Sequence, residues 1–159
     1  MLGPLKDTAE ARGILLLAPD SRGRSWDVII DAFGPDVAFL DRALAHVFER
    51  CQVDAERIGI GGFSDGASYA LSIGLINGAL FSDILAFSPG FVGADEAHGA
   101  PRIFISHGVR DEVLPIDPCS RRLVPGLRTA GYDVDYREFP DGHIVPPEMV
   151  DAAVARFLG

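Results

Sequence analysis

The chain has 159 residues, 48% of them hydrophobic and 23% charged, and its mean hydropathy is +0.20. This composition excludes an intrinsically disordered chain and predicts a single globular domain over residues 1–159. The formal net charge of −9 disfavours binding to nucleic acid or to anionic membrane surfaces. No apolar run approaches the ~20 residues of a membrane helix, and the start of the chain lacks a signal-peptide pattern. We therefore expect a cytoplasmic protein, with secretion left open.

The first part of the chain alternates helical and strand patterns. Leu5–Arg12 predicts a short helix, and the apolar run Ile14–Ala18 predicts a buried strand. Pro35–Gln52 carries apolar residues at steps of three and four, which predicts an amphipathic helix with a proline in its first turn. Arg57–Gly62 predicts the next strand.

The rest of the chain continues this alternation. Three more strands are expected, at Ile84–Phe87, Ile103–Ser106 and Tyr132–Phe139. Three more helices are expected, at Ala67–Asn77, Pro118–Ala130 and Pro147–Leu158, and Pro125 should kink or restart the second of them. The alternation predicts an α/β fold, with a mostly parallel sheet of about five strands and helices on both faces.

The segment Gly62-Phe63-Ser64-Asp65-Gly66 matches the pattern G-x-S-x-G between a predicted strand and a predicted helix. In that context the turn is sharp and strained, and it exposes the serine hydroxyl above the strand ends. We therefore expect Ser64 to be a nucleophile. The backbone N–H of Asp65, at the start of the helix, is then placed to bind a developing oxyanion.

A serine hydroxyl needs a base that takes its proton, and the chain offers four histidines. His143 lies in a turn between the last strand and the last helix, at the same edge of the sheet as Ser64. His46 is expected within a helix and His98 in a loop, whereas His107 ends a strand and is either structural or lines the site. We therefore expect His143 to be the base.

The base needs an acid that orients it. Asp111 lies in a short loop after the strand Ile103–Ser106 and reaches the same edge of the sheet. Asp141 is too close to His143 in the chain, Asp117 is expected to start a helix, and Glu112 is the nearest alternative. Asp111 is therefore the expected acid.

Two cysteines, Cys51 and Cys119, lie far apart and match no metal-binding spacing. We expect two partly buried thiols in a reducing compartment in preference to a disulfide, and no zinc site.

Four segments resemble the carboxylesterase/phospholipase branch of the α/β-hydrolases. They are Leu15–Asp20, Gly61–Ala67, Ser106–Pro115 and Gly142-His143. The order of serine, aspartate and histidine along the chain is also that of the α/β-hydrolases. Dienelactone hydrolases are similar too, but they carry cysteine where this chain has Ser64. The resemblance implies ester hydrolysis through an acyl-enzyme, with no metal and no organic cofactor.

The chain departs from this family at its start. Family members have another strand earlier in the chain, before the segment that corresponds to the helix Leu5–Arg12. In the family's sheet this strand lies between the strands that correspond to Ile14–Ala18 and Arg57–Gly62, and the loop after it donates the second oxyanion N–H. No such segment is found here, so the resemblance implies a truncated fold. Either the two strands pair directly, or another chain inserts or packs there, or the start of a longer protein is missing. An exposed apolar strand edge invites pairing, so we expect a homo-oligomer. The loop Ser21–Trp26 is a candidate source of a replacement donor.

The sequence therefore predicts a serine esterase for small or short-acyl esters. Trp26, Phe33 and Phe63 either pack in the core or, for Trp26 and Phe63 in particular, form a wall of the substrate pocket. A thioesterase of the same fold is one alternative. The other is a non-catalytic remnant that kept the three residues and binds a ligand or partner.

Overall fold

The structure, a computed structural model, describes residues 2–30, 33–94 and 96–159. Within these residues it contains one parallel sheet with the order β1-β2-β3-β4. The strands are β1 (Gly59–Phe63), β2 (Asp83–Phe87), β3 (Arg102–Gly108) and β4 (Val134–Phe139). The predicted α/β class with a parallel sheet is confirmed, with four strands in the described residues against about five expected.

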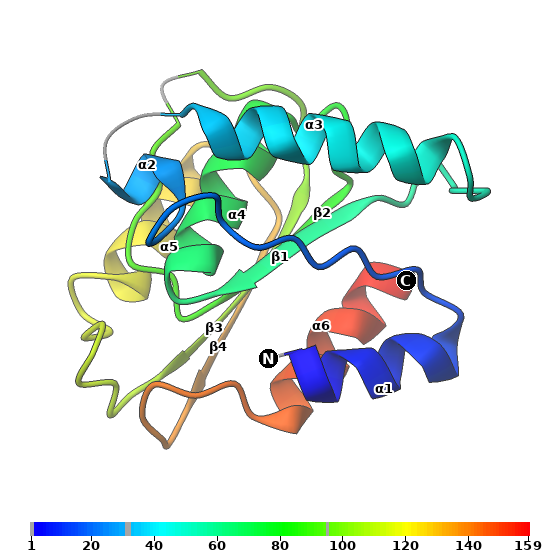
Figure 1. The fold of residues 1–159 in the computed structure, drawn as a ribbon. Helices are drawn as coiled ribbons and strands as arrows, with labels where there is room; N and C mark the ends of the chain where they lie inside the picture. The colour runs from blue at the N-terminus through cyan, green and yellow to red at the C-terminus, as the bar shows by residue number, and fades with distance from the viewer. Residues whose placement is uncertain (1, 31–32, 95) are drawn as a thin grey trace.

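Helices cover both faces of the sheet (Figure 1). On one side lie α3 (Pro35–Phe48), α4 (Asp65–Ile76) and α5 (Ser120–Thr129), with the short α2 (Asp27–Ile30) beside them. On the other side α1 (Leu2–Arg12) contacts α6 (Pro147–Leu158). All four strands are parallel, so all their carboxyl ends lie at one edge.

Successive residues of each strand point to opposite faces, and both faces are buried. Ile84 and Ile103 pack with Leu71 of α4 in one apolar cluster. Phe104 packs instead with Ala153 of α6 on the other face. Burial on both sides explains why these strands read as continuous apolar runs in the sequence.

The predicted strand Ile14–Ala18 is wrong. The segment is extended but pairs with no strand of the sheet, and Leu15, Leu16 and Leu17 are 57%, 38% and 41% exposed. It runs from the α1 side of the molecule to the α3 side (Figure 1). A buried strand needs a neighbour for its backbone N–H and C=O groups, and β1 pairs only with β2 within the described residues. The apolar run thus marks side chains suited to burial, but the described residues leave them partly exposed.

Two smaller differences concern helices. The α5 helix continues through Pro125, so it does not restart there, which was one of the two outcomes that the sequence predicted. Pro125 cannot donate to the carbonyl of Arg121, but both residues are exposed, so water can satisfy that carbonyl. The one-turn helix α2 was not predicted. The buried Asp27 and Asp36 organise this region, since each carboxylate accepts the backbone N–H of the other residue.

No helix in the described part of the chain is long and apolar enough to cross a membrane.

Candidate active site

Ser64 lies on a sharp turn between β1 and α4. Its backbone has φ +58° and ψ −121°, a strained combination for a residue with a side chain. A side chain at Gly62 would clash with the carbonyl of Gly66, so only glycine lets the turn close this tightly. The backbone N–H of Ser64 donates to the carbonyl of Phe87 at 2.9 Å, which ties the turn to the end of β2.

His143 reaches Ser64 from the loop between β4 and α6. Its Nε2 lies 2.9 Å from Oγ of Ser64, across 79 positions of the chain. This loop approaches the end of β3 so closely that a side chain at Gly108 would clash with its backbone. Backbone hydrogen bonds join the two loops, from Val109 to Phe139 and from Arg110 to Asp141, each 2.9 Å long. Because these hydrogen bonds join the two loops, they fix the position of the loop that carries the imidazole.

Asp111 lies in the loop after β3, with its side chain fully buried. Its Oδ2 is 2.6 Å from Nδ1 of His143, and its Oδ1 accepts the backbone N–H groups of Val113 and Leu114 at 2.9 and 2.8 Å. Burial by itself would raise the pKa of Asp111, but hydrogen bonds from His143 and Leu114, with the charge of His143 and the Val113 N–H, outweigh it. The pKa of Asp111 is therefore lowered, and the carboxylate is ionised.

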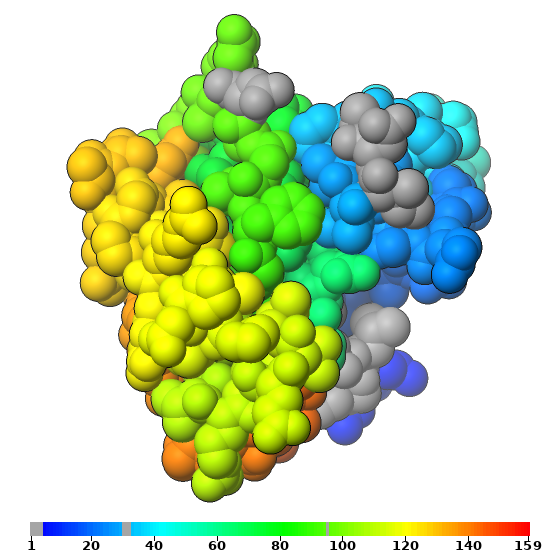
Figure 2. Space-filling model, turned by 90° about the vertical axis from the view of Figure 1, so that its left-hand side faces the viewer, coloured from blue at the N-terminus to red at the C-terminus, as the bar shows by residue number. Residues whose placement is uncertain are grey.

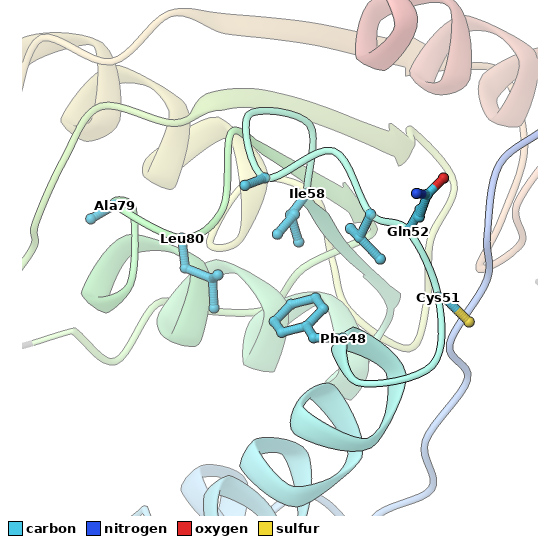
Figure 3. A pocket seen from close by; sticks show the side chains of 8 residues that line it. Phe48, Cys51, Gln52, Ile58, Ala79 and Leu80 are labelled. Carbon is cyan, nitrogen blue, oxygen red and sulfur yellow. The ribbon is translucent and has the colours of Figure 1, made fainter.

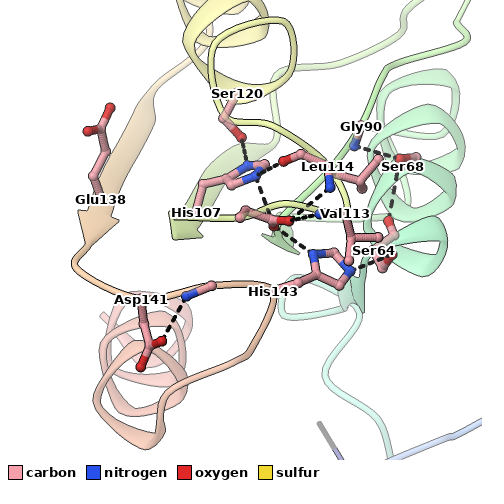
Figure 4. A network of polar contacts seen from close by, with 12 residues as sticks. Ser64, Ser68, Gly90, His107, Val113, Leu114, Ser120, Glu138, Asp141 and His143 are labelled. Carbon is pink, nitrogen blue, oxygen red and sulfur yellow. Dashed lines mark hydrogen bonds and ion pairs between the residues drawn. The ribbon is translucent and has the colours of Figure 1, made fainter. Parts of the chain in front are cut away.

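The structure thus brings Ser64, His143 and Asp111 into one line of contacts (Figure 4). An ionised carboxylate accepts hydrogen bonds, so the proton of a neutral His143 sits on Nδ1 and leaves Nε2 free to accept the Ser64 proton. Figure 2 views the face onto which the strands end, where the loop after β2 lies between the loop after β3 and the segment that precedes α3. The arrangement can activate a hydroxyl for attack on an acyl group.

Asp65 is the first residue of α4, so its backbone N–H has no acceptor within the helix. Its carboxylate accepts a hydrogen bond from the hydroxyl of Ser25 at 2.7 Å. The loop Ser21–Trp26 therefore lies next to the turn that carries Ser64.

The two predicted pocket residues have different surroundings. The ring of Phe63 lies 4.6 Å from that of His143, at the site. Trp26 stacks on Tyr69 at 4.5 Å and belongs to a packed cluster beneath α3, although its indole nitrogen also lies close to Gly66. Phe33 lies farther out, with its ring 6.3 Å from that of Tyr69. Phe63 is thus better placed than Trp26 or Phe33 to contact a bound molecule.

The sequence left His107 with two possible roles, structural or lining the site. It is fully buried, and its Nε2 lies 3.2 Å from Oδ2 of Asp111, the oxygen that also contacts His143. Its spacing of four residues before Asp111, at the end of a buried strand, was the available signal. The sequence could not show which way the ring points.

A second contact that the sequence did not indicate holds the loop after β2. Oγ of Ser68, in α4, accepts the backbone N–H of Gly90 at 2.9 Å (Figure 4). Ser72, one turn later, accepts the N–H of Gly93 at 2.8 Å. These bonds attach the loop to the helix that begins at Ser64.

An open depression of about 660 Å³ lies away from these residues, at the opposite edge of the sheet. Phe48, Ile58 and Leu80 face one another across it (Figure 3), and the last two precede β1 and β2. Since it lies at the other ends of the strands, remote from Ser64, it is not part of the site described above.

In the described residues no group of three or more histidine, cysteine or acidic side chains is arranged to hold a metal ion. Both cysteines are free thiols. Cys119 is buried, but Cys51 is exposed rather than partly buried as the sequence suggested. Cys51 lies in a turn after the end of α3, where its side chain is exposed to solvent.

Comparison with known proteins matches residues 31–158 to the model of the phospholipase/carboxylesterase family. Acyl-protein thioesterase 1 of Gibberella zeae is 32% identical over 112 residues, which make up 63% of this chain and 46% of that protein. Esterase PE8 has a similar structure, with a TM-score of 0.67 and 28% identity, covering 76% of this chain and 58% of that one. A carboxylesterase from Mesorhizobium loti shares the fold over 99% of this chain and 81% of its own, with a TM-score of 0.73 and 24% identity.

This chain spans less than half the length of the thioesterase it matches. The family model nevertheless covers most of the chain, from before α3 to the end of α6, and includes the turn at Ser64 and the loops that carry Asp111 and His143. The chain belongs to the phospholipase/carboxylesterase family and has its α/β-hydrolase fold.

Proposed function

We propose that this chain is a serine hydrolase that cleaves carboxylic esters through an acyl-enzyme, with no metal or organic cofactor. The line of contacts from Ser64 through His143 to Asp111, with distances of 2.9 and 2.6 Å, carries the proposal. Membership of a family of phospholipases and carboxylesterases supports it.

In the first half-reaction Oγ of Ser64 attacks the ester carbonyl while Nε2 of His143 takes the hydroxyl proton. Asp111 stabilises the imidazolium that forms, because its ionised Oδ2 lies 2.6 Å from Nδ1. The tetrahedral intermediate collapses when His143 gives the proton to the departing alkoxide. An alcohol leaves, and the acyl group stays on Ser64.

In the second half-reaction a water molecule takes the place of the alcohol. His143 accepts a proton from the water as its oxygen attacks the acyl carbon, and then returns a proton to Oγ of Ser64. The carboxylic acid leaves, and the free serine is restored. The same residue thus acts as base and then as acid in each half.

The oxyanion of both tetrahedral intermediates needs hydrogen-bond donors. The N–H of Asp65 supplies one, from the first position of α4. The loop Ser21–Trp26 supplies the second in our proposal, and the bond from Ser25 to the Asp65 carboxylate supports this by holding the loop beside the turn.

We propose small or short-acyl esters as the substrate class. The loops at this edge of the sheet carry exposed apolar side chains, at Phe91, Val113 and Ile144, which can contact an acyl or alcohol group. A long acyl chain needs an enclosed tunnel, whereas these side chains are 38%, 65% and 45% exposed. A thioester presents the same carbonyl with a better leaving group, so thioesterase activity is the second candidate, favoured by the similarity to an acyl-protein thioesterase.

Hydrolysis of p-nitrophenyl esters from acetate to palmitate, by the wild type and by Ser64→Ala, tests the proposal. We expect turnover that is highest on short chains and falls at least ~10³-fold in the variant, because the nucleophile is removed. The acyl thioester of matched chain length, run beside each ester, separates the two candidates by their relative kcat/KM.

Thermal unfolding of Ser64→Ala is the control for folding, and we expect its midpoint to stay close to that of the wild type, since alanine keeps the same Cβ on the strained turn. Equal turnover by the folded variant and the wild type would contradict the proposal. It would favour the non-catalytic alternative, in which the site binds a ligand or partner.

We also propose that the chain is a homo-oligomer. Two surfaces support this: the outer edge of β1, which pairs with no strand of the described residues, and the exposed Leu15–Leu17. Light scattering at micromolar concentration is expected to give a mass of at least two chains, and a monomeric mass would count against it. The two free thiols support a reducing compartment, so we propose a cytoplasmic location.

A further inference from the structure

His107 is held by hydrogen bonds at both ring nitrogens (Figure 4). It is fully buried at the end of β3. Its Nε2 lies 2.8 Å from the carbonyl oxygen of Leu114, and its Nδ1 lies 2.7 Å from Oγ of Ser120 at the start of α5. The ring therefore cannot rotate without losing both partners.

The partners determine where the ring carries its proton. A carbonyl oxygen only accepts hydrogen bonds, so Nε2 carries a hydrogen. Burial lowers the pKa of His107, although the Leu114 carbonyl and Asp111 act in the opposite direction, and the ring is neutral. Nδ1 then has no hydrogen and accepts one from the Ser120 hydroxyl, which is itself fully buried.

The protonated nitrogen of this ring also faces the site. Nε2 lies 3.2 Å from Oδ2 of Asp111, and both side chains are completely buried. Leu114 joins the two residues, because its N–H donates to Oδ1 of Asp111 while its carbonyl accepts from His107. With Val113 and His143, four N–H groups surround the Asp111 carboxylate.

We propose that His107 is a positioning residue for the hydrolysis proposed above, on which this inference rests. Its neutral ring, fixed by Ser120 and Leu114, presents an N–H dipole to Oδ2 of Asp111. The dipole keeps that oxygen in line with His143 and shares its negative charge. A freely turning carboxylate would hold His143 in the correct orientation for less of the time.

Other charged or titratable groups near the ring lie in three segments. Asp111 and Cys119 lie in the loop between β3 and α5, His143 lies in the loop after β4, and Glu138 lies in β4 itself. Glu138, in β4, is engaged by Arg121 and by the hydroxyl of Tyr136. Because Glu138 already has these partners, Asp111 is the carboxylate that a change at position 107 affects first.

Two substitutions separate the two nitrogens of the ring. In His107→Gln the amide nitrogen reaches the place of Nε2 and can donate to Asp111 and Leu114. In His107→Asn the shorter amide reaches only the place of Nδ1, beside Ser120, and Asp111 loses its donor. Ser120→Ala is the matched control, since it removes a buried partner of the same ring and leaves the Nε2 hydrogen in place.

We expect kcat/KM on p-nitrophenyl acetate to fall roughly tenfold in His107→Asn, mainly through kcat, and to stay within about threefold of wild type in the other two variants. Loss of the donor concentrates negative charge on Oδ2, which favours protonated His143. The acid limb of the pH profile should therefore move to higher pH by about half a unit in His107→Asn alone. An unchanged acid limb in folded His107→Asn, or equal losses in the Asn and Gln variants, would overturn the proposal.

A second readout does not depend on catalysis. The proton between His143 and Asp111 should give a low-field proton NMR signal in wild type, His107→Gln and Ser120→Ala, and a weaker or shifted signal in His107→Asn. If His107→Asn does not fold, His107→Gln decides: the wild-type signal supports the proposal, and a lost signal overturns it. If Ser64-dependent hydrolysis is absent, the proposed function fails while the signal still reports on His107.

Discussion

Two regions of the molecule differ in how completely their polar groups are hydrogen-bonded and their apolar side chains are buried. Around Asp111, at the carboxyl ends of the strands, a fully buried carboxylate has N–H groups at both oxygens. Along Ile14–Ala18, beyond the outer edge of β1, three leucines are at least 38% exposed and the backbone joins no strand. The polar groups of the first region have partners within the chain, whereas the second region leaves apolar side chains partly exposed beside an unpaired strand edge of the described sheet.

The difference shows that the hydrogen bonds of the site form without any contribution from the open edge of the sheet. Ser64, Asp111 and His143 come from the segments that follow β1, β3 and β4. The extended segment Ile14–Ala18 contributes none of the hydrogen bonds around Ser64. A chain can therefore hold this constellation in place while one edge of its sheet stays open.

The largest expected effect is that of a substitution at Asp111. In Asp111→Asn an amide N–H can face Nδ1 of His143, which favours the wrong tautomer and leaves Nε2 protonated. We expect kcat on p-nitrophenyl acetate to fall by roughly 10³–10⁴-fold with little change in KM. Steady-state kinetics beside Glu112→Gln, the neighbouring acid, measures this. A similar loss in both variants would mean that Asp111 is not the orienting acid.

One pair of matched truncations compares the two regions in stability. Leu71 is fully buried in the main apolar cluster, and Leu71→Ala should lower the free energy of unfolding by ~2–5 kcal/mol. Leu15 is 57% exposed, and Leu15→Ala should change it by no more than ~0.5 kcal/mol. Chemical denaturation at several protein concentrations measures both. A cost at Leu15 that grows with concentration would show that another copy covers this segment.

The same contrast explains what the sequence could predict. Strands buried on both faces, such as Ile103–Ser106, need only their apolar run to be recognised, and the turn at Ser64 has a local pattern that depends on glycine. The assignment of Ile14–Ala18 to the sheet failed because an apolar run reports suitability for burial, whereas a strand also needs a partner supplied by distant residues. Ring direction at His107 is likewise set by Ser120 and Leu114, which the spacing of residues in the chain does not place.

Acid pH should have a smaller effect, on the folding stability that Asp111 contributes. The pKa of Asp111 is lowered in the folded protein, where hydrogen bonds outweigh its burial, so the folded state binds a proton less readily than the unfolded chain does. The stability that results is fully present above the unfolded value of ~3.9 and is lost as pH falls from there through the lower folded value. Each unit of lowering corresponds to ~1.4 kcal/mol at neutral pH.

Urea unfolding between pH 2 and pH 6 should therefore show a drop in stability that is shallower in Asp111→Asn, since the amide does not titrate in this range. The pKa of Glu138 is also lowered, chiefly by its hydrogen bond from Arg121, so Glu138→Gln is the matched comparison. Its side chain is 31% exposed, against none for Asp111, so water and salt screen the interaction. We expect its slope to change less, and the smaller change should disappear at high salt while that of Asp111 persists. Equal salt sensitivity at the two positions would mean that solvent reaches Asp111, and the contrast between a buried carboxylate in the site and an exposed sheet edge would then fail.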